Sequence, residues 1–508
     1  MKNNKQFIIN LLTNLISFSV TFGISFFLSP YVIANVSKEA YGFVALSNDF
    51  VNYIALLTIA LNSMANRFIS VKMHQGKTKE AVSYFNSVLI GNIVIACALI
   101  IPSVVCVLNL EKILNISPGI INDVKVLFAL TFVTFITSII SSTFSIATFV
   151  TNRLDLGSYR DIQASIVKGI VLIVMFKLFR AHVFYVGLAG LCYTIVLLIN
   201  NLYYTKKLLP EFEIGVKYFK ISYIVDMIKA GVWNVISKIS SILSTELSLL
   251  ISNITIGDSA MGILSIAKTL PNIVLQLIGV ISSIFAPEFI ISYAKNEIKD
   301  LNEQIQFSMK IVGMVAGIPI VLLVGFGIPL FKLWLPTVDP VIVYIMAVVY
   351  GAGLLFAGPV EPLYNVFVVT NNIKVPSLYS LVTGVMNICF VFIGINIVQN
   401  DFYKMLIIMG TGTLFTVIRT AVFIPLYAAH CLGFKKTAFY PQVIKSLFSA
   451  IVMIVICVTI HRAVVIDTWV KIIGIAGLTA LIHLIINVLL IFSRDDRQKF
   501  IGKLRKGK

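Results

Sequence analysis

Long apolar stretches follow one another along almost the whole chain, and short polar segments separate them. A helix needs about 20 apolar residues to cross a bilayer, and about fourteen stretches approach that length. Because the stretches are continuous, they predict helices and not the short alternating strands of a closed barrel. The predicted spans lie near residues 7–33, 43–66, 84–108, 124–150, 162–179, 184–204, 223–254, 260–285, 308–332, 341–369, 376–398, 405–428, 441–460 and 470–493.

Lysine and arginine avoid these stretches and gather on alternate loops. If the N-terminus is cytoplasmic, the cytoplasmic loops and tails hold 26 of the 40 Lys and Arg, and the opposite loops hold 9. The positive-inside rule expects such a bias for short loops. The pattern therefore predicts a multi-pass membrane protein with both termini cytoplasmic. The first stretch is too long for a cleaved signal peptide, so it is predicted to remain as a span.

Composition agrees with this interpretation and limits the partners. Of 508 residues, 12% are charged and 58% are hydrophobic, whereas about 25% are charged in a typical soluble protein. The net charge of +18 lies along one membrane face, so it needs no nucleic acid as a partner. The basic run from Arg494 to Lys508 is most simply an anchor for anionic lipid, and binding of a regulatory partner is the less favoured alternative.

The loops and the scattered reactive residues give little support to enzyme chemistry. No loop exceeds about twenty residues, and no GxxxxGK[ST] phosphate loop is present, so nothing predicts a nucleotide-binding domain. The six cysteines have no CxxC pairing and are expected to pack as small apolar residues. The five histidines show no ligand-like spacing. We therefore predict no catalytic residue, no metal site and no cofactor.

Weak internal similarity indicates two halves. Asn14-Leu15-Ile16-Ser17 returns as Asn234-Val235-Ile236-Ser237, and Ala40-Tyr41-Gly42 returns at the same offset as Ala260-Met261-Gly262. Transporters are often built from such repeats. The repeat predicts an N-terminal lobe of six helices over 1–222 and a second lobe of six helices over 223–430. Helices thirteen and fourteen and a basic tail follow over 431–508.

Several of these features resemble one family. The fourteen spans, the segment Ser37-Lys38-Glu39-Ala40-Tyr41-Gly42-Phe43 and the pair Asn66-Arg67 resemble the bacterial polysaccharide flippases. These belong to the multidrug/oligosaccharidyl-lipid/polysaccharide exporter superfamily, with the O-antigen flippase as the type member. The resemblance covers essentially the whole chain. It implies an all-α protein of the bacterial plasma membrane, with two lobes around a central cavity that opens alternately to each side.

The resemblance also implies a substrate and partners. The substrate would be an undecaprenyl-diphosphate-linked oligosaccharide, flipped from the cytoplasmic to the outer leaflet for assembly of cell-surface polysaccharide such as lipopolysaccharide or capsule. Candidate partners are the polysaccharide polymerase and the chain-length machinery. The branch that flips the peptidoglycan precursor has arginines in its first span. Here that span carries no charge between Lys5 and Lys38, which favours another lipid-linked sugar.

Basic residues inside the spans are candidate ligands of the diphosphate. Each ionisable group at mid-bilayer costs about 2.5–3.5 kcal/mol, so its retention indicates a site. Lys238 precedes a polar stripe at helical spacing, and Lys268 aligns by the repeat offset with Asn48, so both are expected near the axis between the lobes. Point charges that converge there would replace the water around a diphosphate. The candidate set is Lys238, Lys268, Lys168, Arg419 and Arg67.

Alternatives remain for these basic residues. Lys238 and Lys268 could instead form internal ion pairs with Asp49 or Glu246 that lock the lobes together. Arg67 could be a positive-inside anchor or a contact of a cytoplasmic gate.

Three acidic residues inside the spans, Asp49, Glu246 and Glu361, are candidates for coupling to a gradient of H+ or Na+. Glu361 lies in Gly358-Pro359-Val360-Glu361-Pro362, where two prolines predict a break in the helix. Such breaks are tolerated where they line a cavity or a hinge. The carboxyl group could carry the coupling ion, or it could cap backbone amides that the break leaves unbonded.

The sequence thus favours a flippase for polyprenyl-diphosphate-linked glycans. The alternative of the same fold is a multidrug or metabolite cation antiporter, whose cavity should be rich in acidic residues. A membrane glycosyltransferase or ligase would need an acidic cluster, and none is evident in the sequence. A scaffold without transport is disfavoured by the cost of lysines within the membrane.

Overall fold

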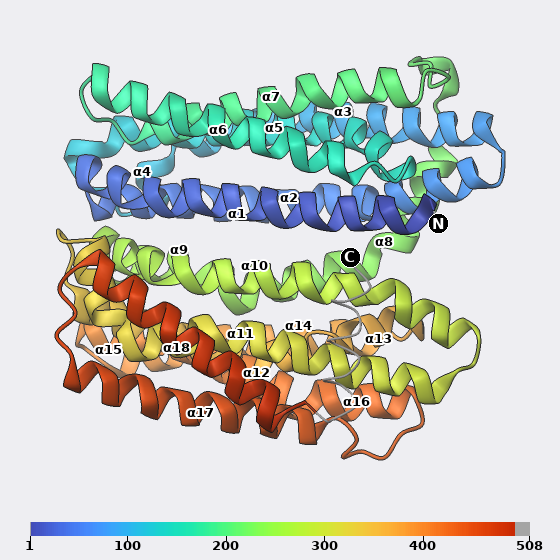
Figure 1. Cartoon of the computed structure of the whole chain (residues 1–508). Coiled ribbons are helices and arrows are strands. Elements are labelled where there is room, and N and C mark those ends of the chain that lie inside the picture. The colour runs from blue at the N-terminus through green and yellow to red at the C-terminus, as the bar shows by residue number, and fades with distance from the viewer. Residues whose placement is uncertain (1, 493–508) are drawn as a thin grey trace. The chain divides into compact units, whose positions relative to one another are not determined.

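The computed structural model describes residues 2–492, and these residues are almost entirely helical, without a strand among them (Figure 1). The prediction of an all-α polytopic membrane protein is confirmed. The basic run that begins at Arg494 lies outside the described residues. The first half contains α1 (Lys2–Val36), α2 (Lys38–His74), α3 (Thr78–Leu108), α4 (Leu110–Ile113), η1 (Pro118–Ile120), α5 (Ile121–Val150), α6 (Leu154–Leu178), α7 (Phe184–Leu208), η2 (Val216–Tyr218), α8 (Ile221–Ser241), η3 (Ile242–Glu246) and α9 (Leu247–Thr255).

The second half begins with a long helix that follows a short turn. Its elements are α10 (Asp258–Ala294), α11 (Ile298–Trp334), α12 (Pro340–Val360), α13 (Leu363–Val369), α14 (Lys374–Ile397), α15 (Asp401–Ile418), η4 (Arg419–Phe423), α16 (Ile424–Cys431), α17 (Tyr440–Ala463) and α18 (Trp469–Leu490). The elements η3 and η4 are π-helical turns, and η1 and η2 are 3₁₀ turns.

Thirteen segments of the described chain are long and apolar enough to cross a membrane. They match thirteen of the predicted spans. The predicted span 162–179 corresponds to α6, which is not among the thirteen and carries Arg160, Asp161 and Lys168. Charged residues lower the hydropathy of a helix, yet α6 still packs against α1 and α7. The chain is therefore a multi-pass membrane protein, and α6 is a long helix that carries several charged residues.

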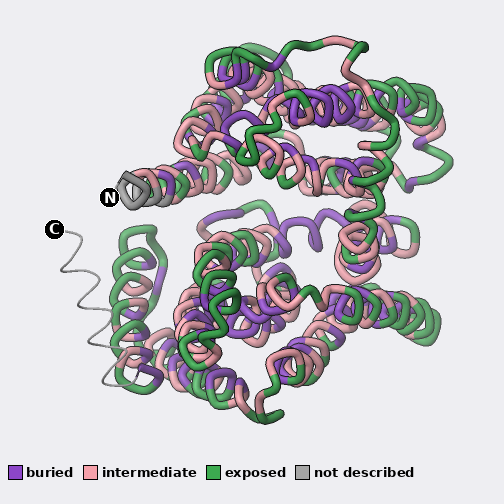
Figure 2. Tube along the Cα trace, turned by 90° about the vertical axis from the view of Figure 1, so that its right-hand side faces the viewer, coloured by how far each residue is buried: buried purple, intermediate pink, exposed green. Residues whose placement is uncertain are grey.

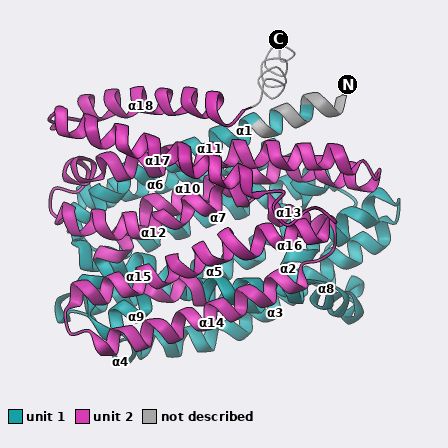
Figure 3. Cartoon of the chain, turned by 90° about the horizontal axis from the view of Figure 1, so that it is seen from below, with its two compact units in different colours: residues 1–242, 249–262 teal, residues 243–248, 263–508 magenta. Residues whose placement is uncertain are grey.

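Helix packing divides the chain into two compact units (Figure 3). Unit 1 comprises Met1–Ile242 and Leu249–Gly262, and unit 2 comprises Leu243–Ser248 and Ile263–Lys508. Unit 1 includes α8, because α8 packs along α2. Figure 2 shows that buried and exposed positions alternate around the helices of each unit, as expected when one face of a helix meets protein. The lobe boundaries at 222 and 430 remain predictions.

Close helix contacts in unit 1 depend on glycine. A Cβ atom on Gly231 of α8 would lie 2.1 Å from the carbonyl oxygen of Ala60 on α2, so only glycine fits this crossing. Gly42 and Gly262, which the internal repeat aligns, lie against each other. A Cβ atom on Gly42 would lie 2.9 Å from the Cα atom of Gly262. These glycines therefore mark places where two helix backbones touch.

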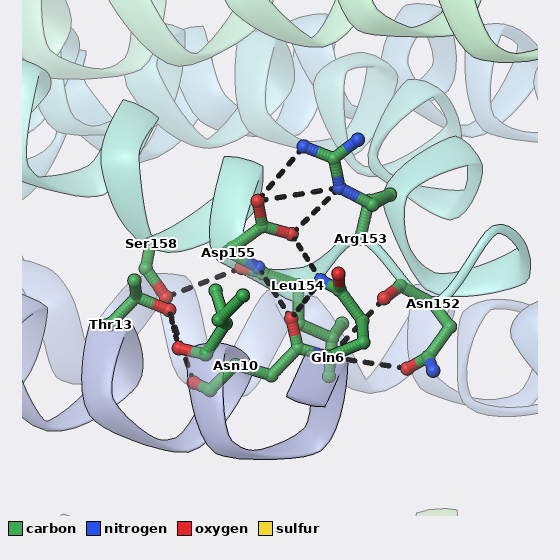
Figure 4. Close-up of polar contacts among 9 residues, drawn as sticks. Gln6, Asn10, Thr13, Asn152, Arg153, Leu154, Asp155 and Ser158 are labelled. Atoms are coloured by element: carbon green, nitrogen blue, oxygen red, sulfur yellow. Dashed lines mark hydrogen bonds and ion pairs between the residues drawn. The ribbon is translucent and has the colours of Figure 1, made fainter. Parts of the chain in front are cut away.

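The start of α1 is fixed to the turn between α5 and α6 by a polar cluster (Figure 4). The Asp155 carboxylate accepts hydrogen bonds from Arg153 Nε at 3.0 Å and from Gln6 Nε2 at 2.9 Å. Asn10 Oδ1 accepts from the Asp155 backbone N–H at 3.0 Å, and Asn10 Nδ2 donates to Asn152. Asn152 has φ +55°, a left-handed conformation that asparagine tolerates better than most residues.

Replacing Asp155 with alanine should lower the free energy of unfolding by about 1–2 kcal/mol, because several donors lose a charged acceptor. The Arg153 guanidinium holds the pKa of Asp155 below its ordinary value. A lowered pKa stabilises the fold above the ordinary value of about 3.9, and this stabilisation is lost as the pH falls through the folded-state pKa. Thermal unfolding in detergent between pH 3 and 7 measures this effect. The melting temperature of the variant should fall below that of the native chain only at the higher pH values.

Asp467→Ala is the matched control for this measurement. Asp467 pairs with Lys471 at 2.6 Å, but both side chains are about half exposed, so the pair should contribute little. A loss of stability in Asp467→Ala as large as that in Asp155→Ala would contradict the assignment.

Unit 2 is built around α11, which packs against α12, α17 and α18. Small residues on α11 admit these neighbours closely. A Cβ atom on Gly325 would lie 2.3 Å from Cys457 Cβ of α17, and one on Gly317 would lie 3.4 Å from the His483 ring of α18. The two C-terminal helices are therefore integral to the core of unit 2. This core positions the irregular turns described next.

Candidate functional site

Three interruptions of regular helix lie around one region of unit 2. They are η3, the break at Glu361 and Pro362 between α12 and α13, and η4. Each contains a residue that the sequence marked as a candidate, namely Glu246, Glu361 and Arg419. π-Helical turns are rare and often occur at functional sites. The predicted ionisable residues therefore coincide with the places where the backbone is irregular.

The carbonyl groups of η3 are bonded from neighbouring helices. A π turn shifts the backbone ladder and leaves carbonyl oxygens that need other donors. Asn387 Nδ2 of α14 lies 3.1 Å from the Leu243 oxygen and 3.3 Å from the Ser244 oxygen. Gly412 of α15 allows this approach, since a Cβ atom there would lie 2.9 Å from the Ser244 oxygen. The turn is thus held in place by α14 and α15.

Lys268 of α10 supplies the next donor to η3. Its Nζ donates to the Thr245 carbonyl oxygen at 2.8 Å and to Ser248 Oγ at 3.0 Å. Nζ also lies 5.7 Å from the ring centroid of Tyr350 on α12, within the range of a cation–π contact. Only 6% of Lys268 is exposed. An ammonium group so deeply buried needs oxygen partners, and Thr245 and Ser248 provide two of them.

Glu361 sits where α12 gives way to α13. Its backbone N–H still bonds to Ala357 at 2.8 Å, but Pro359 and Pro362 have no N–H to donate, so the regular ladder stops. The predicted break in this helix is confirmed. The side chain of Glu361 lies near Arg419 of η4, close enough for the two charges to interact.

A cavity of about 100 Å³ lies beside these groups within unit 2. It contacts η3, α10, α12, α13, α15 and η4. Arg419 Nε and Thr413 Oγ1 are buried without a hydrogen-bond partner among the described residues. A water molecule needs roughly 10–15 Å³ of such space, so the cavity can hold several waters or one small ion with water. Its walls are formed by Thr245, Leu275, Tyr350, Gly353, Leu354, Ala357, Glu361, Tyr364, Gly412, Thr413, Thr416, Arg419 and Thr420.

The structure brings Glu361 and Arg419 together at this cavity, and Lys268 adjoins it through Thr245 and Tyr350. Glu246 lies next to Thr245 on η3. The other candidates, Lys238, Asp49, Lys168 and Arg67, belong to unit 1. The roles of all eight residues remain predictions.

Two of the unit 1 candidates have surroundings that the sequence did not indicate. α2 continues two turns beyond Arg67 to His74, so Arg67 is an exposed residue within a helix and does not end it. Lys168 is half-buried on α6, three residues after Ser165, whose hydroxyl is hydrogen-bonded to that of Thr21 on α1 at 3.0 Å.

Asn387→Ala should destabilise unit 2 by about 1–3 kcal/mol, because the partly buried carbonyl oxygens of Leu243 and Ser244 lose their donor. Thermal unfolding in detergent would measure this loss. Asn396→Ala on the same helix is the control, since Asn396 is exposed and donates to the Phe392 carbonyl oxygen of its own helix at 2.8 Å. Equal melting temperatures for the two variants would contradict this explanation.

Comparison with solved structures identifies the fold. The chain superposes on the lipid II flippase MurJ, in an inward closed conformation, with a TM-score of 0.67 and 15% identity over 98% of this chain and 99% of that one. It superposes on an inward-facing multidrug resistance MATE family transporter of the MOP superfamily with a TM-score of 0.64 and 13% identity. That match covers 84% of this chain and 98% of the transporter. The chain has the fold of the MOP superfamily transporters.

One further solved structure matches the chain, and one protein is related to it in sequence. A MOP superfamily transporter from Pyrococcus furiosus, described by the reverse polarity of its binding pocket, matches with a TM-score of 0.63 and 11% identity over 84% of this chain and 95% of that one. A Bacillus subtilis (strain 168) membrane protein, EpsK, described as uncharacterized, is 25% identical over 507 residues, which is 99% of each chain. No family model matches the chain. The resemblance predicted from the sequence is confirmed at the level of this fold.

Within the MOP fold, several polar residues of the cavity were not predicted from the sequence. The Tyr350 hydroxyl donates to Asn272 Oδ1 at 2.9 Å, and Asn272 lies one helical turn after Lys268 on α10. Thr413, Thr416 and Thr420 line the same cavity. Their spacing of three and four residues in an apolar helix is a polar stripe, which is the signal that could have identified them.

Proposed function

We propose that this protein flips a polyprenyl-diphosphate-linked oligosaccharide from the cytoplasmic to the outer leaflet by alternating access, for assembly of cell-surface polysaccharide. The observation that supports it most is Lys268, an ammonium group that is 6% exposed within a membrane-spanning helix. Burying this charge is costly, so its retention within the membrane indicates a functional site. A diphosphate group is an anion. Lys268 can bind it by exchanging its present hydrogen-bond acceptors, Thr245 and Ser248, for phosphate oxygens.

The charge of the interior favours this substrate over a cationic drug. Arg419 adds a second cation to the polar region of unit 2, next to the carboxyl group of Glu361. A carrier of cations would be expected to have mainly acidic groups there. The Pyrococcus furiosus neighbour is itself described by reverse polarity of its binding pocket and a suggested different function, so this fold is compatible with more than one polarity.

The extent of the structural matches points in the same direction. The lipid II flippase corresponds to 98% of this chain, whereas the MATE transporter corresponds to 84%. A multidrug or metabolite cation antiporter remains the second candidate. It is favoured by the description of the MATE neighbour as a multidrug resistance transporter.

Glu361 is proposed to couple transport to a gradient of H+ or Na+. The cavity of about 100 Å³ is too small for a sugar but has room for a small cation and water. Protonation of the Glu361 carboxyl, or binding of Na+ to it, would change its interaction with Arg419. The irregular backbone of η4 and of the α12–α13 junction would then rearrange in response. Asp49 and Glu246 remain alternative coupling residues.

A bacterial plasma membrane with both termini on its cytoplasmic side is the proposed location, on the basis of the loop charges. Polysaccharide polymerase and chain-length machinery remain proposed partners.

Binding of a fluorescent polyprenyl diphosphate to the purified protein tests this proposal. Lys238→Ala/Lys268→Ala should weaken the affinity about 10- to 100-fold, since charge-assisted hydrogen bonds contribute about 1.5–3 kcal/mol. Lys229→Ala is the control, because Lys229 lies exposed on the same helix as Lys238. Inorganic diphosphate should compete with the probe and uncharged polyprenol should not. Equal affinity of the native chain and the double variant would reject the proposed site.

A further inference from the structure

At one end of unit 1, three lysines lie close to the carboxylate of Glu80. Lys72 Nζ lies 2.6 Å and Lys77 Nζ lies 3.8 Å from carboxylate oxygens of Glu80, where α2 turns into α3. Lys220, which precedes α8, lies close enough for its charge to act on the same carboxylate. Asp226 of α8, whose charge acts on Tyr84 together with those of Lys72 and Glu80, adds a second negative charge, so the three lysines exceed these two carboxylates by one charge. This lysine cluster, made of Lys72, Lys77 and Lys220, therefore attracts an anion.

The fold holds the lysine cluster together across distant parts of the sequence. The Lys220 backbone N–H donates to Ser87 Oγ of α3 at 3.0 Å. Tyr223 stacks on Tyr84 with ring centroids 3.9 Å apart, and Lys220 Nζ lies 5.3 Å from the Tyr223 centroid. Figure 1 shows the segment between α7 and α8 at the same end of unit 1 as the turn between α2 and α3. The lysines are thus presented by packed elements and not by one loose loop.

Aliphatic side chains next to this cluster are strongly exposed. Ile214, Val216 and Ile221 leave 61%, 79% and 63% of their surface uncovered. Ile214 and Val216 belong to the segment that joins two candidate membrane spans, α7 and α8, and Ile221 is the first residue of α8. All three therefore lie where the chain enters or leaves a span, at the level of the membrane surface. Aliphatic residues beside lysine and tyrosine are typical of segments that sit at the boundary between headgroups and acyl chains.

We propose that the lysine cluster binds the phosphate headgroup of an anionic phospholipid, while Ile214, Val216 and Ile221 insert among its acyl chains. The excess of positive charge matches the phosphate, and the exposed aliphatic residues match the lipid tail. A free phosphate or an acidic peptide would use the lysines but would leave those aliphatic residues in water. The site lies apart from the cavity of unit 2 and goes beyond the proposed transport function. It would fix this end of unit 1 in an anionic leaflet.

Native mass spectrometry of lipids retained by the full chain tests this proposal. The protein is equilibrated with mixtures of phosphatidylglycerol and phosphatidylethanolamine. Lys77→Gln/Lys220→Gln should weaken phosphatidylglycerol binding about tenfold or more, with phosphatidylethanolamine unchanged, since each basic residue at an anionic surface contributes measurably. Lys435→Gln/Lys436→Gln is the matched control. These two lysines are exposed, but their aromatic neighbours Phe434 and Phe439 pack in a core cluster of unit 2.

A second variant separates the lipid site from simple charge attraction. Val216→Ser should lower phosphatidylglycerol retention although the net charge is unchanged. Equal losses of phosphatidylglycerol binding in the cluster variant and in the control variant would overturn the proposal.

Displacement of the retained lipid by polyprenyl phosphate would assign the cluster to the transported lipid. Displacement by inorganic diphosphate would assign it to a free anion. Either displacement would also overturn the proposal as stated.

Discussion

Lys268→Met should reduce translocation of a polyprenyl-diphosphate sugar about 10- to 100-fold in proteoliposomes. The methionine keeps much of the volume of lysine but removes the buried charge, and charge-assisted hydrogen bonds are typically worth about 1.5–3 kcal/mol. The same change removes the donor to Thr245 and Ser248. Transport should be measured as the fraction of labelled sugar-lipid that becomes accessible to a membrane-impermeant reagent with time.

Lys295→Ala serves as the control for this experiment, because Lys295 is exposed just beyond the end of the same helix, α10. Lys268→Arg retains the charge but presents a planar guanidinium group, so it should recover only part of the activity. Melting temperatures of the variants show whether unit 2 remains folded. Native rates in a folded Lys268→Met protein would contradict a role for Lys268 in binding the substrate.

Glu361→Gln should abolish the acceleration of transport by an ion gradient while the protein remains folded. Glutamine has nearly the shape of glutamate but neither binds a proton nor carries the charge that attracts Na+. In this variant an imposed H+ or Na+ gradient should change the transport rate less than about twofold. The reason is that the free energy of the ion gradient is no longer coupled to the conformational change. Rates at opposite gradients, compared between native chain and variant, measure this effect.

Glu297→Gln is the matched control, since Glu297 is an exposed carboxylate in the turn before α11. It should respond to the gradient like the native chain. Undiminished gradient dependence in Glu361→Gln would exclude Glu361 as the coupling group and leave Asp49 and Glu246 as candidates.

The sequence predicted the helical class and the number of long helices well because apolar length is a direct signal. Thirteen predicted spans correspond to segments able to cross a membrane. The break near Glu361 was also predictable, because Pro359 and Pro362 cannot donate backbone hydrogen bonds. The helix ends were less predictable. α2 extends from Lys38 to His74, beyond the predicted span 43–66, since polar residues continue a helix past the apolar layer.

The π-helical turns could not be predicted from the sequence. η3 depends on Asn387 and Lys268, which lie far along the chain and bond to its carbonyl oxygens. No local pattern in Ile242–Glu246 reveals such partners. For the same reason, the helical spacing of the polar residues after Lys238 suggested one continuous stripe, whereas the structure places the π turn η3 within it.

The cavity residues were predictable only in part. Glu361 and Arg419 stood out as charges in apolar segments. The threonines around them are neutral and common in membrane helices, so only their spacing distinguished them. Whether Lys238 and Lys268 act on one substrate remains a prediction from the repeat.

The most direct test is translocation itself, measured with the purified native chain in liposomes. The rates for a diphosphate-linked polyprenyl sugar and for a lipophilic cationic dye are compared in the same preparation, with protein-free liposomes as the baseline. We expect the sugar-lipid to cross and the dye to remain at the baseline rate. Dye transport without movement of the sugar-lipid would contradict the flippase assignment and indicate a cation antiporter with the same fold.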